Sequence, residues 1–249
     1  MNDDRDLIID LAHVSKLYKM GNVIVPALTD ASLSIQSGEM VSIVGPSGSG
    51  KSTLMNVLGC LDVPTSGKYL LSNEDVSQMN DNRLAKIRNA QIGFIFQTYN
   101  LLPRLTALSN VELPLLYGDS RDSKARCVQS LERVGLGERV NHKPSELSGG
   151  EQQRVGIARA IVKQPTLILA DEPTGNLDSH SSNEIVAILQ DLNKVENLTV
   201  VIVTHDSEVA NCTNRIISMR DGRIIDDSRV QNRRWLKTLE YDSVGDNQF

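Results

Sequence analysis

Short apolar runs, separated by polar or glycine-rich segments, recur along most of this chain. Leu7–Tyr18 and Ala31–Ile35 alternate apolar and polar residues, a pattern typical of half-buried strands. Thr166–Ala170 and Thr199–Val203 are continuously apolar and β-branched, which is typical of strands buried on both faces of a parallel sheet. Shorter apolar runs predict further strands at Met40–Val44, Tyr69–Leu71 and Ile92–Phe96. The pattern therefore predicts an α/β fold.

The pattern changes between Leu101 and Ala160, where apolar residues recur every three or four positions. This spacing places them on one face of a helix, and intervening prolines and glycines divide the segment into separate helices. The apolar positions are Leu108, Val111, Leu115, Val128, Leu131, Val134 and Leu136. We therefore expect a mostly helical lobe, over about residues 98–160, inserted between strands of the core.

The length suits one domain over residues 5–228, and the sequence turns polar in a tail at 229–249. The tail holds a basic and aromatic group that would suit lipid headgroups or a membrane protein. These residues are Arg233, Arg234, Trp235 and Lys237. The interpretation that we favour is a solvated or disordered tail, because chain ends are commonly poorly ordered.

Composition narrows the class of protein. The chain is 40% hydrophobic and 23% charged, as in ordinary globular proteins. Its net charge of −5 argues against nucleic acid as a partner, because no basic excess is present to neutralise phosphates. The apolar runs are much shorter than the roughly 20 residues of a membrane-spanning helix. The acidic N-terminus lacks the apolar segment of a signal peptide.

Three cysteines, Cys60, Cys127 and Cys212, lie far apart and include no Cys-x-x-Cys pair. An odd number at these spacings is a poor fit to a disulfide framework or to a metal site. We interpret them as buried or idle thiols, which indicates a reducing, cytoplasmic environment.

A glycine-rich loop follows Met40–Val44 and precedes a segment of helical character, Ser52–Leu58. Its sequence, GPSGSGKS, satisfies the phosphate-loop pattern in full, and the strand–loop–helix context argues against a chance glycine turn. The glycines let backbone N–H groups converge on phosphates, Lys51 would contact the β- and γ-phosphates, and the Ser52 hydroxyl would ligate Mg²⁺. The residues expected to bind nucleotide here are Gly45, Pro46, Ser47, Gly48, Ser49, Gly50, Lys51, Ser52 and Thr53.

Polar residues follow three of the expected strands. Asp171 and Glu172 end one strand, where Asp171 would ligate Mg²⁺ and Glu172 would polarise the attacking water. His205 follows another and would contact the γ-phosphate while holding Glu172 and the water in register. Gln97 follows a third strand and would sense the γ-phosphate by the same logic.

Each of these residues also has a structural interpretation. Strand-end carboxylates are commonly just solvated, and Gln97 alone would be read as a surface amide. The phosphate loop favours the functional interpretation of the carboxylates, whereas for Gln97 that interpretation depends on the family resemblance given below. A lone histidine is more commonly structural, and that interpretation is kept for His13, His142 and His180.

A second glycine-rich segment, LSGGEQQR at Leu147–Arg154, leads into a helical pattern. A helix start of this kind is another anion-binding site, so two such sites suggest a nucleotide held from two sides. Near the N-terminus, Tyr18 would stack on the adenine ring, although packing is the simpler interpretation of a tyrosine at a strand end.

In this order, the motifs resemble those of ATP-binding-cassette (ABC) ATPases over about nine tenths of the chain. The corresponding segments are the Walker A motif at 45–52, the Q-loop at Gln97, the signature at 147–152, the Walker B motif at 166–171, the D-loop at Gly175–Asp178 and the switch at His205. The resemblance implies a RecA-like P-loop core with an N-terminal antiparallel β subdomain and an inserted α-helical subdomain. It implies ATP and Mg²⁺ as ligands, Mg²⁺ being held by Ser52, Gln97 and Asp171. It also places Tyr18 at the adenine-stacking position, which favours stacking over packing for this residue.

The resemblance further implies a head-to-tail dimer that sandwiches ATP. The signature residues of one copy would meet the γ-phosphate bound at Lys51 of the other, and Asp178 would couple the two sites. The signature residues concerned are Ser148, Gly149, Gly150 and Glu151. Glu151 stands where many relatives have glutamine, and both residues are common there. Within each site, Glu172, His205 and Lys51 would be catalytic.

Segments 45–67, 92–117 and 168–179 are similar to the branch that contains macrolide exporters and lipoprotein-release ATPases (MacB- and LolD-like). This implies a subunit on the cytoplasmic face of the inner membrane that energises a separate permease. The work would be efflux, lipoprotein release or mechanotransmission. Residues 100–104, directly after Gln97, are the expected contact region for the permease.

Two other classes of protein fit the sequence less well. DNA-acting ABC-type ATPases need a long coiled coil between the nucleotide motifs, and ribosome-acting members carry two cassettes in one chain, whereas this chain has room for neither. A regulatory module that holds ATP without hydrolysing it is disfavoured because Lys51, Asp171, Glu172 and His205 are all present.

Overall fold

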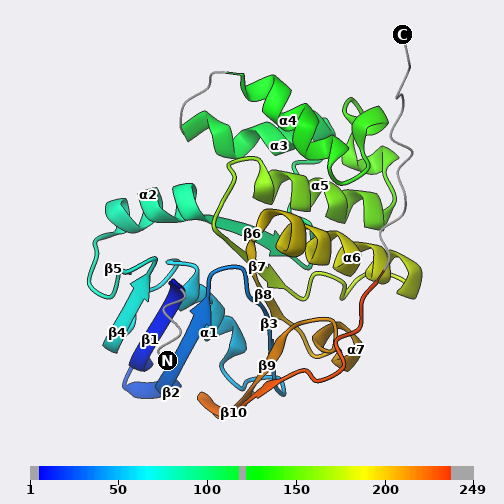
Figure 1. Ribbon diagram of the computed structural model, residues 1–249. Helices are drawn as coiled ribbons and strands as arrows, with labels where there is room; N and C mark the ends of the chain where they lie inside the picture. Colours follow the sequence, from blue (N-terminus) through cyan, green and yellow to red (C-terminus); the bar gives the residue numbers. More distant parts are fainter. Residues whose placement is uncertain (1–5, 118–121, 237–249) are drawn as a thin grey trace.

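The structure, a computed structural model, describes residues 6–117 and 122–236. Two sheets and a group of helices make up this part of the chain, with the helices α3, α4 and α5 on one side and an antiparallel sheet on the other (Figure 1). The strands are β1 (Leu7–Met20), β2 (Val23–Gln36), β3 (Met40–Val44), β4 (Ser66–Leu71), β5 (Glu74–Asp75), β6 (Ile92–Phe96), β7 (Leu167–Asp171), β8 (Thr199–Val203), β9 (Arg215–Arg220) and β10 (Arg223–Arg229).

The helices include α1 (Lys51–Leu58), α2 (Asp81–Gln91), α3 (Ala107–Glu112), α4 (Ser123–Glu132), α5 (Gly149–Ile161), α6 (Ser179–Glu196) and α7 (Ser207–Ala210). Short 3₁₀ helices lie at η1 (Leu113–Tyr117), η2 (Gly137–Arg139) and η3 (Pro144–Glu146). Within residues 6–117 and 122–236, no helix has both the length and the apolar character needed to cross a membrane.

The core sheet has the strand order β10-β9-β3-β8-β7-β6, and all its pairs are parallel except β9 with β10. Strands β7 and β8 are buried along their length, as their apolar sequences predict. Alternate residues face two cores. One core is shared with α5 and α6 and takes Ile168, Ala170, Val200 and Ile202. The other is shared with α1, β1 and β2 and takes Leu167, Leu169, Val201 and Val203.

The antiparallel sheet has the order β2-β1-β4-β5, and its first two strands are longer than the sequence pattern predicts. Instead of Ala31–Ile35, β2 extends from Val23 to Gln36. Its first half was missed because Val23, Ile24 and Val25 are exposed apolar residues followed by a proline, so no alternation marks them. Pro26 is accommodated because β2 is an edge strand.

The predicted helical subdomain is present, and α3, α4 and α5 pack against one another. Its apolar residues, including Val111 and Leu131, belong to the same core as one face of the parallel sheet. Helix α5 joins the two parts because it also contacts β6. The prediction of buried thiols is likewise confirmed: all three cysteines are free and buried, and burial raises the pKa of Cys60 and of Cys127 to about 11.

Residues 230–236 of the expected tail are held against the core, although Gln231, Asn232, Arg234 and Trp235 stay exposed to solvent. They continue from β10 and dock against the core, where Leu236 packs on the hydrophobic cluster and Arg234 forms an ion pair with Glu208. The polar sequence does not reveal this docking, because the segment is bound through backbone groups and arginine side chains and not through a run of apolar residues. Lys237 and the residues after it lie outside the described part of the chain.

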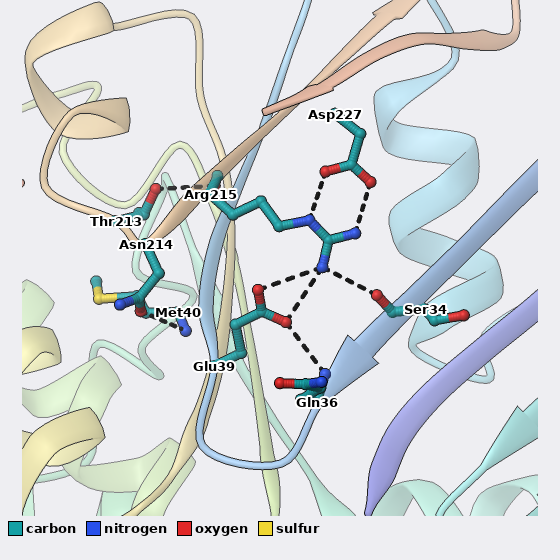
Figure 2. Close-up of polar contacts among 8 residues, drawn as sticks. All are labelled: Ser34, Gln36, Glu39, Met40, Thr213, Asn214, Arg215 and Asp227. Carbon is teal, nitrogen blue, oxygen red and sulfur yellow. Dashed lines mark hydrogen bonds and ion pairs between the residues drawn. The ribbon is translucent and has the colours of Figure 1, made fainter. Parts of the chain in front are cut away.

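Arg215 joins elements that are distant in sequence (Figure 2). Its guanidinium forms a fork with the Asp227 carboxylate of β10, and its Nη1 donates to the Ser34 carbonyl of β2 at 3.0 Å. The same nitrogen lies 3.2 Å from both carboxylate oxygens of Glu39, immediately before β3. Hydrogen bonding to Asp227, with the charges of both carboxylates, raises the pKa of Arg215. The cluster ties the antiparallel sheet to the strand that enters the phosphate loop.

Replacing Arg215 by alanine should destabilise the fold, because Glu39 and Asp227 would lose the charge that compensates them. We expect the free energy of unfolding to fall by about 2–4 kcal/mol, measured by urea denaturation. Arg215→Lys should recover only part of this loss, since lysine lacks the planar fork.

The matched control is Arg220→Ala, which removes an exposed arginine 3.9 Å from Asp221. We expect a change under about 0.5 kcal/mol there. Equal effects of Arg215→Ala and Arg220→Ala would contradict a central role for Arg215.

Candidate functional site

Three adjacent strands end at the same edge of the core sheet. Val203 of β8 lies opposite Ile43 of β3 on one side and opposite Asp171 of β7 on the other. The glycine loop, the carboxylates and His205 therefore leave the sheet at the same level. Phe96 of β6 pairs with Asp171, which brings Gln97 to this edge as well. The parallel register thus gathers the strand-end residues predicted from the sequence.

The glycine loop needs its glycines for conformation and for space. Gly48 and Gly50 have φ values of +78° and +99°, and Gly50 caps the N-terminus of α1. A Cβ at Gly50 would lie 2.7 Å from the Ala27 carbonyl, and one at Gly45 would lie 2.3 Å from the Met219 carbonyl. Any side chain at these two positions would displace backbone. The loop is therefore shaped by its neighbours as well as by its own sequence.

The turn between β9 and β10 supports the glycine loop through backbone hydrogen bonds. The Gly222 N–H donates to the Ser49 carbonyl at 3.0 Å, and the Gly222 carbonyl accepts from the Thr29 N–H at 2.9 Å. The loop is thus held between this turn and β2. Sequence reasoning missed Gly222, although the Asp221-Gly222 dipeptide is a typical hairpin signal that could have found it.

Lys51 reaches back across the loop. Its Nζ donates to the carbonyls of Gly45 and Pro46 at 2.8 and 2.9 Å. Its charge also acts on Asp171 and on His205. The ammonium group is therefore held on the phosphate loop, within electrostatic reach of the other two strand ends.

Glu172 and His205 form a pair at this edge. The Nδ1 of His205 lies 2.7 Å from Oε1 of Glu172, and the Thr204 hydroxyl donates to Oε2 at 3.2 Å. The Glu172 N–H donates to the Val203 carbonyl at 2.8 Å, and its φ is +44°. A positive φ in a residue with a side chain is uncommon and clusters at functional sites. Glu172 is thus oriented from both its backbone and its side chain.

The site perturbs the titration of two groups. Burial raises the pKa of Asp171, and the neighbouring Glu172 charge adds to this, while Lys51 opposes it. The hydrogen bond and the charge of Glu172 raise the pKa of His205, whose side chain is 74% exposed. Perturbed groups gathered at one edge are typical of a catalytic site.

Two of the three predicted Mg²⁺ ligands fit that role by chemistry and position. Ser52 lies in the first turn of α1, which contacts β7, the strand that ends at Asp171. A hydroxyl and a carboxylate are oxygen donors of the kind that Mg²⁺ prefers. The third, Gln97, is engaged with the D-loop, because its Nε2 lies 3.3 Å from Oδ1 of Asn176 and its carbonyl accepts from Asn176.

Tyr18 lies beside the start of α1. Its hydroxyl donates to Asp62 at 2.8 Å and also contacts the Thr53 side chain. Burial, followed by Asp62, raises the pKa of Tyr18. The Lys16 ammonium lies over the ring, 5.1 Å from its centroid. Tyr18 therefore packs beside the helix that follows the phosphate loop, through Asp62 and Thr53.

The signature residues start helix α5. The Glu151 N–H donates to the Ser148 hydroxyl at 3.2 Å, and the Ser148 N–H donates to the Glu151 carboxylate at 2.8 Å, a complete capping box. The backbone N–H of Ser148 lowers the pKa of Glu151. A Cβ at Gly150 would lie 3.1 Å from the Ser181 hydroxyl of α6. The start of α5 therefore lies against the start of α6.

Asp178 caps α6. Its carboxylate accepts from the N–H groups of His180 and Ser181, each at 3.0 Å, and these bonds lower its pKa. The signature and the D-loop, which the sequence presented as separate motifs, are thus adjacent helix starts.

Gln153 is a functional candidate that sequence reasoning missed. This fully buried residue of α5 donates from Nε2 to the carbonyls of Phe96, at 3.2 Å, and Pro173, at 2.6 Å. Phe96 precedes Gln97, and Pro173 follows Glu172, so one amide links the signature helix to both loops. A glutamine on the apolar side of a helix was the available signal.

Together, a phosphate loop, a glutamate–histidine pair and a capped signature helix on a RecA-like sheet define the nucleotide-binding cassette of an ABC-type ATPase. The family model described as ABC transporter matches residues 28–175. This chain belongs to the ABC transporter ATP-binding family, and it is an ATPase.

Relatives confirm the resemblance to the MacB branch. The ABC transporter ATP-binding protein YvrO of Bacillus subtilis (strain 168) is 51% identical over 224 residues, covering 89% of this chain and 97% of YvrO. The macrolide export ATP-binding/permease protein MacB of Chlorobaculum tepidum is 48% identical over 228 residues, or 91% of this chain and 35% of MacB. The chain thus spans about a third of the length of that protein.

Solved structures confirm the fold. A dimeric, post-hydrolysis structure of the ATP-binding cassette MJ0796 with ADP and Pi has a TM-score of 0.82 at 46% identity, covering 90% of this chain and 99% of MJ0796. CbiO1 of Clostridium perfringens, part of the transporter complex CbiONQ, also has a TM-score of 0.82, at 26% identity, covering 91% of this chain and 90% of CbiO1.

The pair predicts a histidine with an altered titration. In NMR titrations, His205 should show a pKa above the ordinary value of about 6.5, and Glu172→Gln should bring it back toward that value. Because the pKa is raised in the folded state, the stability from this contact is complete below about pH 6.5 and is lost as the pH rises through the folded-state pKa. His205→Gln assigns the signal, and an unchanged His205 pKa in Glu172→Gln would contradict the contact.

Proposed function

We propose that this chain is the ATP-hydrolysing subunit of a transporter and energises a separate permease of the MacB type through ATP-driven dimer closure. The observation that carries the proposal is the 2.7 Å contact between Glu172 and His205, at the sheet edge that also bears the phosphate loop. The glutamate of such a pair can act as a general base for the attacking water, while the phosphate loop beside it binds ATP.

Glu172 is the residue that we assign to the attacking water. His205 holds one carboxylate oxygen and Thr204 the other, so the carboxylate is fixed before ATP arrives. Lys51 binds the β- and γ-phosphates, for which its Nζ leaves the carbonyls of Gly45 and Pro46. Because phosphoryl transfer depends mainly on positioning and electrostatics, these fixed groups supply much of what hydrolysis needs.

The Ser52 hydroxyl and the Asp171 carboxylate are the ligands that we assign to Mg²⁺, with Gln97 joining them when it leaves Asn176. When bound, Mg²⁺ neutralises charge on the β- and γ-phosphate oxygens. The raised pKa of Asp171 supports this assignment, because a half-buried carboxylate beside a second carboxylate is stabilised by a cation. Tyr18 is the residue that we assign to the adenine.

Replacing Glu172 by glutamine should separate binding from hydrolysis. The amide keeps the shape of the side chain but cannot accept a proton, so we expect ATP turnover to fall by about 100-fold or more. Binding of a fluorescent ATP analogue should stay within about twofold of the original protein. The control is Glu138→Gln, an exposed glutamate of η2, which should leave both quantities unchanged. Normal turnover in Glu172→Gln would remove Glu172 from this role.

Two copies complete the site in our proposal. The MJ0796 cassette forms a dimer in two solved structures at 46% and 47% identity. Ser148, Gly149, Gly150 and Glu151 of one copy would meet the γ-phosphate held at Lys51 of the other. The capping box supports this, because it fixes the conformation of the N-terminus of α5. That end of the helix carries a partial positive charge, which attracts a phosphate. Asp178 lies beside it at the start of α6, where it would couple the two sites.

The permease is proposed to dock in a groove between α2, β6 and α5. The groove has a volume of about 710 Å³, and stacked Phe94 and Phe96 lie in it with Asn100, the first residue of the predicted contact region. Its charged lining residues are Lys86, Arg88, Arg159 and Lys163. No carboxylate from residues 6–117 or 122–236 is among its lining residues. An apolar floor with a basic rim suits an acidic amphipathic segment.

Two of these cations already donate hydrogen bonds to backbone carbonyls within the fold. Arg88 donates to the Cys60 carbonyl at 2.7 Å, and Arg159 donates to the Tyr99 and Asn100 carbonyls at 2.7 and 2.6 Å. Lys86 and Lys163 are therefore the residues that we assign to the permease. Burial, with the charge of Arg126, lowers the pKa of Lys163, which an incoming carboxylate would reverse. Docking there would hold the chain peripherally on the cytoplasmic face of the membrane.

Reversing these charges should uncouple the chain from its permease. We expect Lys86→Glu with Lys163→Glu to recover at least about tenfold less permease from native membranes, in the ATP-loaded Glu172→Gln background. In the original sequence, the same double change should leave ATP turnover of the chain alone unchanged. Lys68→Glu, which changes an exposed lysine of β4, is the matched control. Equal recovery of the permease by both would place docking elsewhere.

A further inference from the structure

The segment Val230–Leu236, here called the C-terminal strap, is bound to the core through its backbone. The Arg234 N–H donates to the Asn211 carbonyl at 2.9 Å, and the Leu236 N–H donates to Oε1 of Gln190 at 3.0 Å. Gln190 Nε2 in turn donates to the Arg234 carbonyl at 2.8 Å. Gln190 is fully buried in α6, so its amide depends on the strap for satisfied hydrogen bonds.

Side chains of the strap add charged and aromatic contacts. Arg234 Nη1 lies 2.8 Å from the Glu208 carboxylate of α7. Arg233 Nε donates to the Cys212 carbonyl at 2.8 Å, and its guanidinium lies over the Trp235 ring, 4.1 Å from the centroid. Lys194 of α6 lies over the same ring at 5.5 Å. The strap is therefore a built part of the fold, joined to α6 and to α7.

Helix α7 needs this support. It has four residues, far fewer than an isolated helix needs to be stable in water. The carbonyls just past its end, those of Asn211 and Cys212, are bound by Arg233, Arg234 and Gln190. At its other end, Asp206 caps the helix, and His205 directly precedes that cap. His205 thus lies between the end of β8, where the Thr204 N–H donates to the Ile43 carbonyl at 3.1 Å, and the cap of α7, so the orientation of α7 constrains its C-terminal side.

The strap and the catalytic pair also share a cavity. It has a volume of about 510 Å³ and lies between α6, α7 and the strap. Its lining includes Glu172, His205, Glu208, Cys212, Arg234 and Leu236. A shift of the strap therefore changes the shape of a cavity that the pair also lines.

We propose that the C-terminal strap is a positioning element for ATP hydrolysis: it holds α7 and so keeps His205 against Glu172. Arg234 is its principal positioning residue, because it contacts α7 through its side chain and the Asn211 and Gln190 groups through its backbone. The inference rests on the proposed roles of Glu172 and His205.

The test compares steady-state ATP hydrolysis in five variants of the full chain. Truncation after Arg229 and Arg234→Ala should each lower kcat, by about tenfold and about threefold respectively, with KM for ATP within about twofold. Arg234→Lys keeps the ion pair with Glu208 and should restore kcat to within about twofold. Truncation after Leu236 keeps the strap, and Arg83→Ala removes an arginine from another exposed ion pair, so both should leave kcat unchanged.

A second measurement is independent of turnover. In Arg234→Ala, the side-chain NMR signals of His205 should move toward their positions in Glu172→Gln, because both changes loosen the same contact. Unchanged kcat and unchanged His205 signals in Arg234→Ala would overturn the proposal, even if the truncated chain fails to fold. So would a loss of kcat that Arg234→Lys fails to restore.

Failure of the proposed function is seen separately. Normal turnover in Glu172→Gln would remove that residue from catalysis, while the His205 signals in Arg234→Ala would still report whether the strap positions the histidine.

Discussion

The register of three adjacent parallel strands is the constraint on which the site depends. Strands β3, β8 and β7 are paired so that Ile43, Val203 and Asp171 lie level with one another. Parallel pairing sends all three chains out of the sheet at one edge, and burial of both faces keeps the strands from slipping. A phosphate loop, a carboxylate pair and a histidine, far apart in sequence, are thereby brought together. Open α/β sheets bind their ligands at this edge for the same reason.

Buried polar side chains connect this edge to the rest of the molecule. Gln153 joins the signature helix to the backbone beside Gln97 and beside Glu172. Gln190 joins helix α6 to the C-terminal strap and to the end of α7. A buried amide that loses its partner is costly, so such links transmit displacement between elements. Docking of a permease beside Asn100 would therefore act close to Gln153, which donates to the Phe96 carbonyl in the groove and to the Pro173 carbonyl next to Glu172. A displacement at the groove could reach Glu172 through this side chain.

Peripheral elements are held by cations. Arg215 gathers β2, β10 and the entry to β3, while Arg234 holds α7. The guanidinium group suits this task, because it offers several donors in a fixed plane and remains charged. Polar segments whose sequence predicts a solvent-exposed surface, such as β10 and the strap, thus stabilise the fold through these arginines. The strap is held by arginine side chains and backbone groups, so a sequence pattern based on apolar residues does not reveal that it is docked.

Local spacing determined much of this protein. The glycine loop, the strand ending at Asp171, the position of His205 and the helix start after Ser148 each depend on residues within one short segment, so their patterns could be read directly. Tertiary structure alone decided the support of Ser49 by Gly222 and the docking of the strap on Gln190, and it set the geometry of the expected contact between His205 and Glu172. These contacts join segments far apart in the chain, whose pairing depends on strand order and packing, and no local periodicity records either of them.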